Sequence, residues 1–113
     1  MSEKPDDQQR IEHMLQAIDK IDAFTNGFDQ DDFVRDERTQ YAVIKLFEII
    51  GEAAYRISDE QKDAFPAVEW KKIQGMRHLL VHEYYRINSI LIWNTITDKL
   101  HTLRELLVTL LEE

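Results

Sequence analysis

Residues 76–85 bring together the side chains that could break a phosphodiester bond, namely Arg77, His78, His82 and Tyr84. Arginine is permanently charged, and its planar guanidinium matches the geometry of a phosphate. Histidine takes or gives a proton near neutral pH. A histidine that moves the proton and an arginine that stabilises charge on the phosphoryl oxygens could together cleave the bond without a metal.

The spacing of these residues sets how they could cooperate on a helix. Arg77 and His82 are five residues apart, which places them about 140° from each other on an ideal helix. That angle is too wide for a direct pair, but a long arginine side chain can still reach the same groove. His78 and His82 share a face at i,i+4, as do Arg77 and Tyr84 at i,i+7. One helix therefore offers half a site, and a second copy across a two-fold axis could supply the other half.

The remaining chain predicts helices that would position this segment. Apolar residues recur at helical spacing, period-two alternation is absent, and only 3 glycines and 2 prolines are available for turns. We expect an all-α bundle of about four to five helices, formed by one domain that covers residues 1–113, with residues 1–6 as a disordered tail. The expected helices are 7–25, 32–56, a short one between Ser58 and Pro66, a turn at 70–74, the motif helix 76–85, and 88–111.

Composition narrows the class of protein. A hydrophobic content of 43% with 32% charged residues is typical of a soluble globular chain. Apolar runs stay well below the roughly 20 residues of a membrane span, and the polar, acidic N-terminus does not resemble a signal peptide. The absence of cysteine excludes disulfides and thiolate zinc sites. We therefore expect a cytoplasmic protein.

A formal net charge of −8 argues at first against a nucleic-acid partner. The charge is unevenly distributed, however. Residues 70–86 contain one acidic residue, Glu83, against four basic residues: Lys71, Lys72, Arg77 and Arg86. Positive charge is thus gathered around the motif, and local sign matters more for phosphate binding than the total.

The pattern Arg77, four residues, His82, one residue, Tyr84 resembles the R-x4-H-x-Y motif of the HEPN superfamily, specifically its HepT-like toxins. The resemblance covers roughly residues 8–111. Residues 38–45 and 48–54 resemble the family's second helix, residues 66–76 resemble the lead-in to its motif, and residues 87–95 resemble the start of its last helix. One position departs from the pattern, because the residue after the arginine is often asparagine or aspartate and here is His78.

This resemblance implies a metal-independent endoribonuclease toxin of a type VII-like toxin–antitoxin pair, with no cofactor and a product that ends in a 2′,3′-cyclic phosphate. His82 would act as general base or acid, Arg77 would hold the scissile phosphate, and His78 would contribute to the same site. The cleft would lie between two copies of a homodimer. Lys71, Lys72 and Arg86 would contact the RNA substrate.

The resemblance gives Tyr84 a role in regulation. In HepT-like pairs, a nucleotidyltransferase antitoxin encoded beside the toxin can silence it by adding nucleotides to this tyrosine. Such an adduct would place a bulky polyanion beside Arg77 and block the substrate phosphate.

Other interpretations stay open. The chain could be a non-catalytic HEPN module that binds a nucleotide or a nucleotidyltransferase partner, or a plain helical dimerisation module. Outside the resemblance, Arg77 and His82 would most simply be a structural pair. The i,i+4 histidines form a weak metal-site pattern, because no third ligand stands at a diagnostic spacing.

Several residues outside the motif have structural interpretations. We expect Gly51 to mark a close helix crossing, and Glu48 and Glu52 to form a polar stripe that pairs with Lys45 and Arg56. Two tryptophans, Trp70 and Trp93, are expected in the core and not as base-stacking platforms.

Overall fold

The computed structural model describes residues 6–82 and 87–112, apart from the side chains of residues 78–82. These residues fold into an all-helical bundle, as the sequence predicts. The described helices are α1 (Asp7–Phe24), α2 (Gln30–Arg35), α3 (Glu37–Arg56), α4 (Asp59–Ala64), α5 (Trp70–His82), α6 (Ser89–Thr95), the π-helical segment η1 (Ile96–Leu100) and α7 (His101–Leu111).

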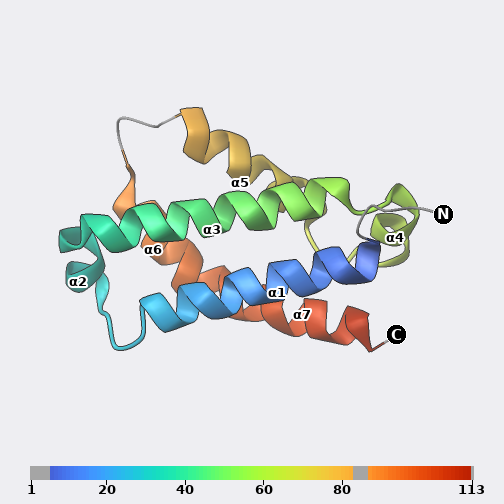
Figure 1. Cartoon of the computed structure of the whole chain (residues 1–113), viewed down its shortest axis with the longest axis horizontal. Helices are drawn as coiled ribbons and strands as arrows, with labels where there is room; N and C mark the ends of the chain where they lie inside the picture. Colours follow the sequence, from blue (N-terminus) through green and yellow to red (C-terminus); the bar gives the residue numbers. More distant parts are fainter. Residues whose placement is uncertain (1–5, 83–86, 113) are drawn as a thin grey trace.

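The bundle is built from α1 and α5, which run in one direction, and from α3 and the α6–η1–α7 helix, which run in the opposite direction (Figure 1). Helix α3 runs through its middle and packs against α1 on one side and α5 on the other. Helix α1 also packs against α7, which continues from α6 through η1. The two short helices α2 and α4 lie at opposite ends of the bundle (Figure 1). None of the described helices is long and apolar enough to cross a membrane.

Local signals place the ends of α1 close to the expected positions. Asp6 is the N-cap, because its carboxylate accepts a hydrogen bond from the Gln9 backbone N–H while the Gln9 side chain accepts one from Asp6 N. At the other end, Gly27 has a φ of +79°, a left-handed conformation that glycine adopts without strain. The expected helix of residues 7–25 is therefore confirmed to within one residue.

The expected helix of residues 32–56 is wrong in one respect, because the chain breaks at Asp36 into α2 and α3. The Asp36 carboxylate accepts hydrogen bonds from the backbone N–H and the hydroxyl of Thr39, so Asp36 caps a new helix. The buried Gln40 amide donates to the carbonyls of Phe33 and Val34, which satisfies the end of α2. This break turns Phe33 into the core, where its ring lies 5.5 Å from that of Trp93.

The segment around the motif also differs from expectation. The residue between the expected turn and the expected motif helix is Gly75, but Trp70 begins a helix that passes through Gly75 and continues without interruption to His82. A glycine inside a helix costs about 1 kcal/mol relative to alanine, and the packing of α5 on α3 outweighs that cost. The separate turn at 70–74 and the motif helix at 76–85 are therefore one element, and residues 83–85 lie outside the described part of the chain.

One hydrophobic core joins all the long helices. It centres on apolar side chains from α1 and α3, among which Met14, Ile18, Val43 and Ala54 are completely buried. Trp70 is buried, and Trp93 packs against the core as a half-buried side chain, so the expectation of core tryptophans is confirmed. The α7 helix adds Leu107 and Leu110, and it is tied to α1 by an Arg104–Asp19 ion pair of 2.8 Å.

Candidate functional site

Arg77 reaches its place through a close crossing of α5 over α3. A Cβ atom at Gly51 would lie 3.1 Å from the Ile73 carbonyl oxygen, 3.3 Å from Arg77 N and 3.1 Å from Arg77 Cβ. Glycine in α3 lets the α5 backbone come this near without displacement, so the expected close crossing at Gly51 is confirmed. The first carbon of the Arg77 side chain therefore starts directly on the surface of α3.

Two α3 residues hold the guanidinium of Arg77. Its Nη1 donates to Glu52 Oε1 at 2.8 Å, and its Cζ lies 3.9 Å above the centre of the Tyr55 ring. The Arg77 side chain is 21% exposed, compared with 46% for Glu52. A charge-assisted hydrogen bond and a cation–π contact fix the plane of the group from two directions. Arg77 is thus pre-positioned at the surface, with a rim open to solvent.

Glu52 bridges two arginines. Its second carboxylate oxygen, Oε2, accepts a hydrogen bond from Arg56 Nε at 2.7 Å, one helical turn further along α3. The Arg56 bond, followed by the Arg77 bond, lowers the pKa of the Glu52 carboxyl below its usual 4.5. Glu52 is therefore ionised at neutral pH, and the three side chains together carry one net positive charge.

The sequence interpretation of the two glutamates was partly correct. Glu48 pairs with Lys45 at 3.9 Å and Glu52 pairs with Arg56, as the polar stripe predicts. The sequence did not indicate the contact from Glu52 to Arg77, 25 residues away. Tyr55 was missed as well. The only signal for either contact is that Gly51, the predicted crossing point, directly precedes Glu52.

The other motif residues can be located only through the backbone. His78 directly follows Arg77 in α5 and His82 lies five residues after Arg77, and the side chains of both histidines are outside the described part of the structure. Tyr84 and Arg86 lie outside the described residues altogether. Helix α5 thus places Arg77 and the backbones of the two histidines on one continuous element.

Lys71 and Lys72, at the start of α5, are both exposed. Lys72 Nζ lies 2.9 Å from Glu69 Oε2, and this ion pair lowers the pKa of the Glu69 carboxyl. Lys71 lines an open groove that it shares with Tyr55 and Arg56. The structure therefore brings Lys71 to the same side as the Arg77 contacts, whereas the charge of Lys72 is largely offset by its neighbour.

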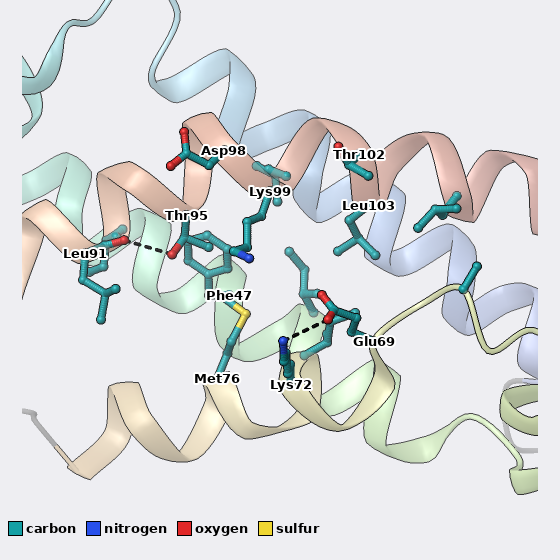
Figure 2. A pocket seen from close by; sticks show the side chains of 16 residues that line it. Phe47, Glu69, Lys72, Met76, Leu91, Thr95, Asp98, Lys99, Thr102 and Leu103 are labelled. Carbon is teal, nitrogen blue, oxygen red and sulfur yellow. Dashed lines mark hydrogen bonds and ion pairs between the residues drawn. The ribbon is translucent and has the colours of Figure 1, made fainter.

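A second hollow lies between α5 and the α6–η1–α7 helix (Figure 2). Its volume is about 420 Å³, and its floor is apolar, with Phe47, Ile73, Met76 and Leu103 among the lining side chains. Charged groups stand at its edge, including the Lys72–Glu69 pair drawn in Figure 2. Apart from Met76, the hollow holds none of the described motif residues, so we do not place the phosphodiester chemistry there.

Comparisons with known proteins agree with the resemblance to the HepT-like family. A family model described as "Ribonuclease HepT-like" matches residues 14–110. A protein of Thermococcus cleftensis named "Probable ribonuclease HepT" is 34% identical over 94 residues, which cover 83% of this chain and 86% of that protein. A protein of Caldanaerobacter subterraneus with a provisional RNase name is 34% identical over 103 residues, 91% and 92% of the two chains.

A third relative, from Methanocaldococcus jannaschii, also carries a provisional RNase name. It is 35% identical over 85 residues, which cover 75% of this chain and 78% of that protein. No solved structure matches the chain.

Proposed function

This chain belongs to the HepT-like ribonuclease family, and on that premise we propose that it is a metal-independent endoribonuclease that acts as the toxin of a toxin–antitoxin pair. The seating of Arg77 carries the proposal. An arginine that is held by Glu52 and Tyr55 before any substrate arrives can receive a phosphate with little reorganisation, which is how electrostatic stabilisation of a transition state is most effective.

In the proposed reaction the nucleophile is the 2′-hydroxyl of the RNA itself. His82 accepts the hydroxyl proton while the 2′-oxygen attacks phosphorus, and the bond from phosphorus to the 5′-oxygen breaks. A second acid gives a proton to the leaving 5′-oxygen, so the products are a 2′,3′-cyclic phosphate and a 5′-hydroxyl. Arg77 stabilises the negative charge on the phosphoryl oxygens. In a homodimer the second acid would be the same histidine of the other copy, with His78 close by.

Cleavage of RNA by the purified protein in the presence of EDTA tests this function. We expect fragments that end in 2′,3′-cyclic phosphate, identified by mass spectrometry. His82→Ala and Arg77→Ala should lower the rate at least about 100-fold, as expected for loss of an acid–base group or an oxyanion contact. His101→Ala is the matched control, because His101 is 80% exposed and pairs only with Glu105 among the described residues. An equal rate for His82→Ala and His101→Ala would disprove the assignment.

Induced expression in a bacterial host tests the toxin role. Wild-type protein should arrest growth, and His82→Ala at the same protein level should not. Growth arrest by both variants would show that toxicity does not come from the proposed chemistry.

The proposed partner is a nucleotidyltransferase antitoxin that modifies Tyr84. Co-expression with such an enzyme should add the mass of one or more AMP groups to the peptide that contains Tyr84 and should abolish cleavage. Tyr85 is a built-in control because it is the adjacent tyrosine. Modification of Tyr85 with an unmodified Tyr84 would contradict the proposal.

We further propose that the protein works as a homodimer, since one copy of α5 offers half of a site. Two neighbouring apolar residues, Ile90 and Leu91, are 51% and 44% exposed, and Leu91 also lines the apolar hollow. The mass in solution, measured by light scattering on a size-exclusion column, should be twice the 13.5 kDa of one chain. A monomer that retains full activity would refute a shared site.

A further inference from the structure

We propose that the RNA strand next to the scissile phosphate runs from Arg77 across Tyr55 to Arg56, and then into the groove between α3, α4 and the start of α5. This inference rests on the ribonuclease function proposed above. It adds a binding site for the flanking nucleotides, with Arg56 as a contact for a neighbouring phosphate, Tyr55 as a base platform and Lys71 as a further phosphate contact.

The shared carboxylate of Glu52 brings the two arginines together. Arg77 Nη1 and Arg56 Nε bind different oxygens of this one group, at 2.8 and 2.7 Å, so the two guanidinium groups stand side by side. Arginine binds phosphate with a planar fork of donors. Two adjacent arginines suit two phosphates of one strand better than a single free phosphate, which would need only one of them.

Tyr55 directly precedes Arg56 in α3, and its ring lies under the Arg77 guanidinium. Its side chain is 51% exposed, although it belongs to a helix that is otherwise central to the bundle. The Arg77 guanidinium already stacks on the ring at 3.9 Å. Arginine planes and aromatic rings are the surfaces on which proteins stack unpaired bases. The exposed part of this stack would therefore suit a nucleobase attached to the phosphate at Arg77.

A groove of about 1020 Å³ begins at Tyr55 and Arg56. Its floor is partly apolar, and Trp70 within it donates its indole N–H to the Phe65 carbonyl. Lys62 reaches across from α4 and donates to the Tyr55 backbone carbonyl at 3.2 Å, which holds its positive charge at the groove. Basic residues dominate the charged lining: Arg10, Arg56, Lys62, Lys71 and Lys72.

The charge of this groove is opposite to that of the chain. Three acidic residues, Asp59, Asp63 and Glu69, oppose the five basic ones, and Glu69 is already paired with Lys72. The groove thus keeps a surplus of two positive charges on a protein whose formal net charge is −8. Positive charge that follows a groove, together with an exposed aromatic ring at its end, is typical of sites that bind single-stranded nucleic acid.

Binding of 2′-O-methyl RNA, which cannot form the cyclic phosphate, tests the groove separately from cleavage. Fluorescence anisotropy would measure how tightly a dinucleotide and an octanucleotide bind to the wild type and to Arg56→Gln, Lys71→Gln and Tyr55→Ala. We expect the octanucleotide to bind several-fold more weakly to each charge variant and about tenfold more weakly to Tyr55→Ala. The loss of affinity should be larger for the octanucleotide, which is long enough to reach the groove, than for the dinucleotide. The dependence of log K on log salt should fall by about 0.7 for each phosphate contact removed.

Lys45→Gln is the matched control, because Lys45 is an exposed, ion-paired residue of the same helix α3 that does not line the groove. In cleavage assays on a long RNA, Lys71→Gln should raise KM and leave kcat close to the wild-type value, whereas a structural effect would lower stability and kcat together. One outcome would disprove RNA binding in the groove but leave the proposed function standing. In that outcome the wild type cleaves RNA, and Arg56→Gln and Lys71→Gln bind the octanucleotide as tightly as Lys45→Gln does. If the wild type neither binds nor cleaves RNA, both proposals are wrong.

Discussion

Replacing Gly51 by alanine is the most direct perturbation of the helix crossing that places Arg77. The added methyl carbon would meet three atoms of α5 at 3.1 to 3.3 Å: the Ile73 carbonyl oxygen, Arg77 N and Arg77 Cβ. Two of these are backbone atoms, which cannot rotate away. Helix α5 must therefore move by a few tenths of an ångström from α3.

Two opposing contributions set the effect on stability. Alanine favours a helix interior over glycine by about 1 kcal/mol, whereas adding a methyl group to a tightly packed crossing costs about 1–3 kcal/mol. We expect a net loss of stability between roughly zero and 2 kcal/mol. The substitution should also lower the cleavage rate, because the shift of α5 moves Arg77 relative to Glu52, to which it forms a hydrogen bond of 2.8 Å. Since a misplacement of about 1 Å can cost about 100-fold in rate, a several-fold loss of kcat is expected.

Gly75→Ala is the matched control, because Gly75 is also a glycine inside a helix and a Cβ atom there would meet no atom within 4 Å. Urea denaturation should show that Gly75→Ala stabilises the domain by about 1 kcal/mol, with cleavage unchanged. Gly51→Ala should instead lower the stability by between roughly zero and 2 kcal/mol, and it should cleave RNA more slowly. Equal stabilisation by the two substitutions would show that α5 does not press on α3, and the account of how Arg77 is placed would be wrong.

Three further results are expected. Glu52→Gln should lower kcat/KM several-fold, because Arg77 and Arg56 lose a charged acceptor. Glu48→Gln is the control and should leave kcat/KM unchanged. A larger loss for Glu48→Gln than for Glu52→Gln would contradict the role of Glu52 in positioning Arg77. The pKa of the Glu52 carboxyl is lowered in the folded protein, so the ionised carboxylate stabilises the fold. The wild type should therefore be more stable than Glu52→Gln by the full amount above pH 4.5, and this difference should disappear as the pH falls through the lowered pKa. Denaturation at several pH values measures the difference. Phe33→Ala should cost about 3–5 kcal/mol in the free energy of unfolding, while Phe24→Ala, at a side chain 47% exposed, should cost less than about 0.5 kcal/mol.

Helical periodicity and composition were sufficient to predict the architecture. The spacing of apolar residues predicted α1 and the last long helix, and the serine at position 58 predicted the start of α4, which the structure confirms. The break at Asp36 was not predicted, because Phe33 and Tyr41 were assigned to one helical repeat although residues 35–40 between them are all polar. The Asp36 cap on α3 and the Gln40 amide, which satisfies two carbonyls at the end of α2, together make the interruption favourable, and the Gln40 contact depends on how α2 folds against α3.

The candidate site could be predicted in part. The motif pointed to Arg77, and local charge pointed to Lys71 as a residue on the same side. The contacts of Arg77 with Glu52 and Tyr55 could not be predicted from a helical repeat, because these residues lie in another helix, 25 and 22 positions before Arg77. Spacing within one helix shows which residues share a face, but it does not show which face of a second helix they meet.

Helix α4, which forms one wall of the groove, has an unusual basis for its stability. None of its six residues is buried. Ser58 caps the first turn of α4, because its hydroxyl accepts a hydrogen bond from the Gln61 backbone N–H. Asp7 of α1 holds Ser58 in turn: the Asp7 carboxylate accepts hydrogen bonds from the Ser58 hydroxyl at 2.6 Å and from the Ser58 backbone N–H at 3.0 Å. An element without buried apolar contacts opens by local unfolding while the core stays closed.

The amide hydrogens of α4 should therefore exchange with solvent far faster than those of α1 or α3. A strand of RNA in the groove would raise their protection, so that this wall gains order when it is occupied. The cost of ordering α4 would then be subtracted from the binding energy, which would favour rapid release of the cleaved strand.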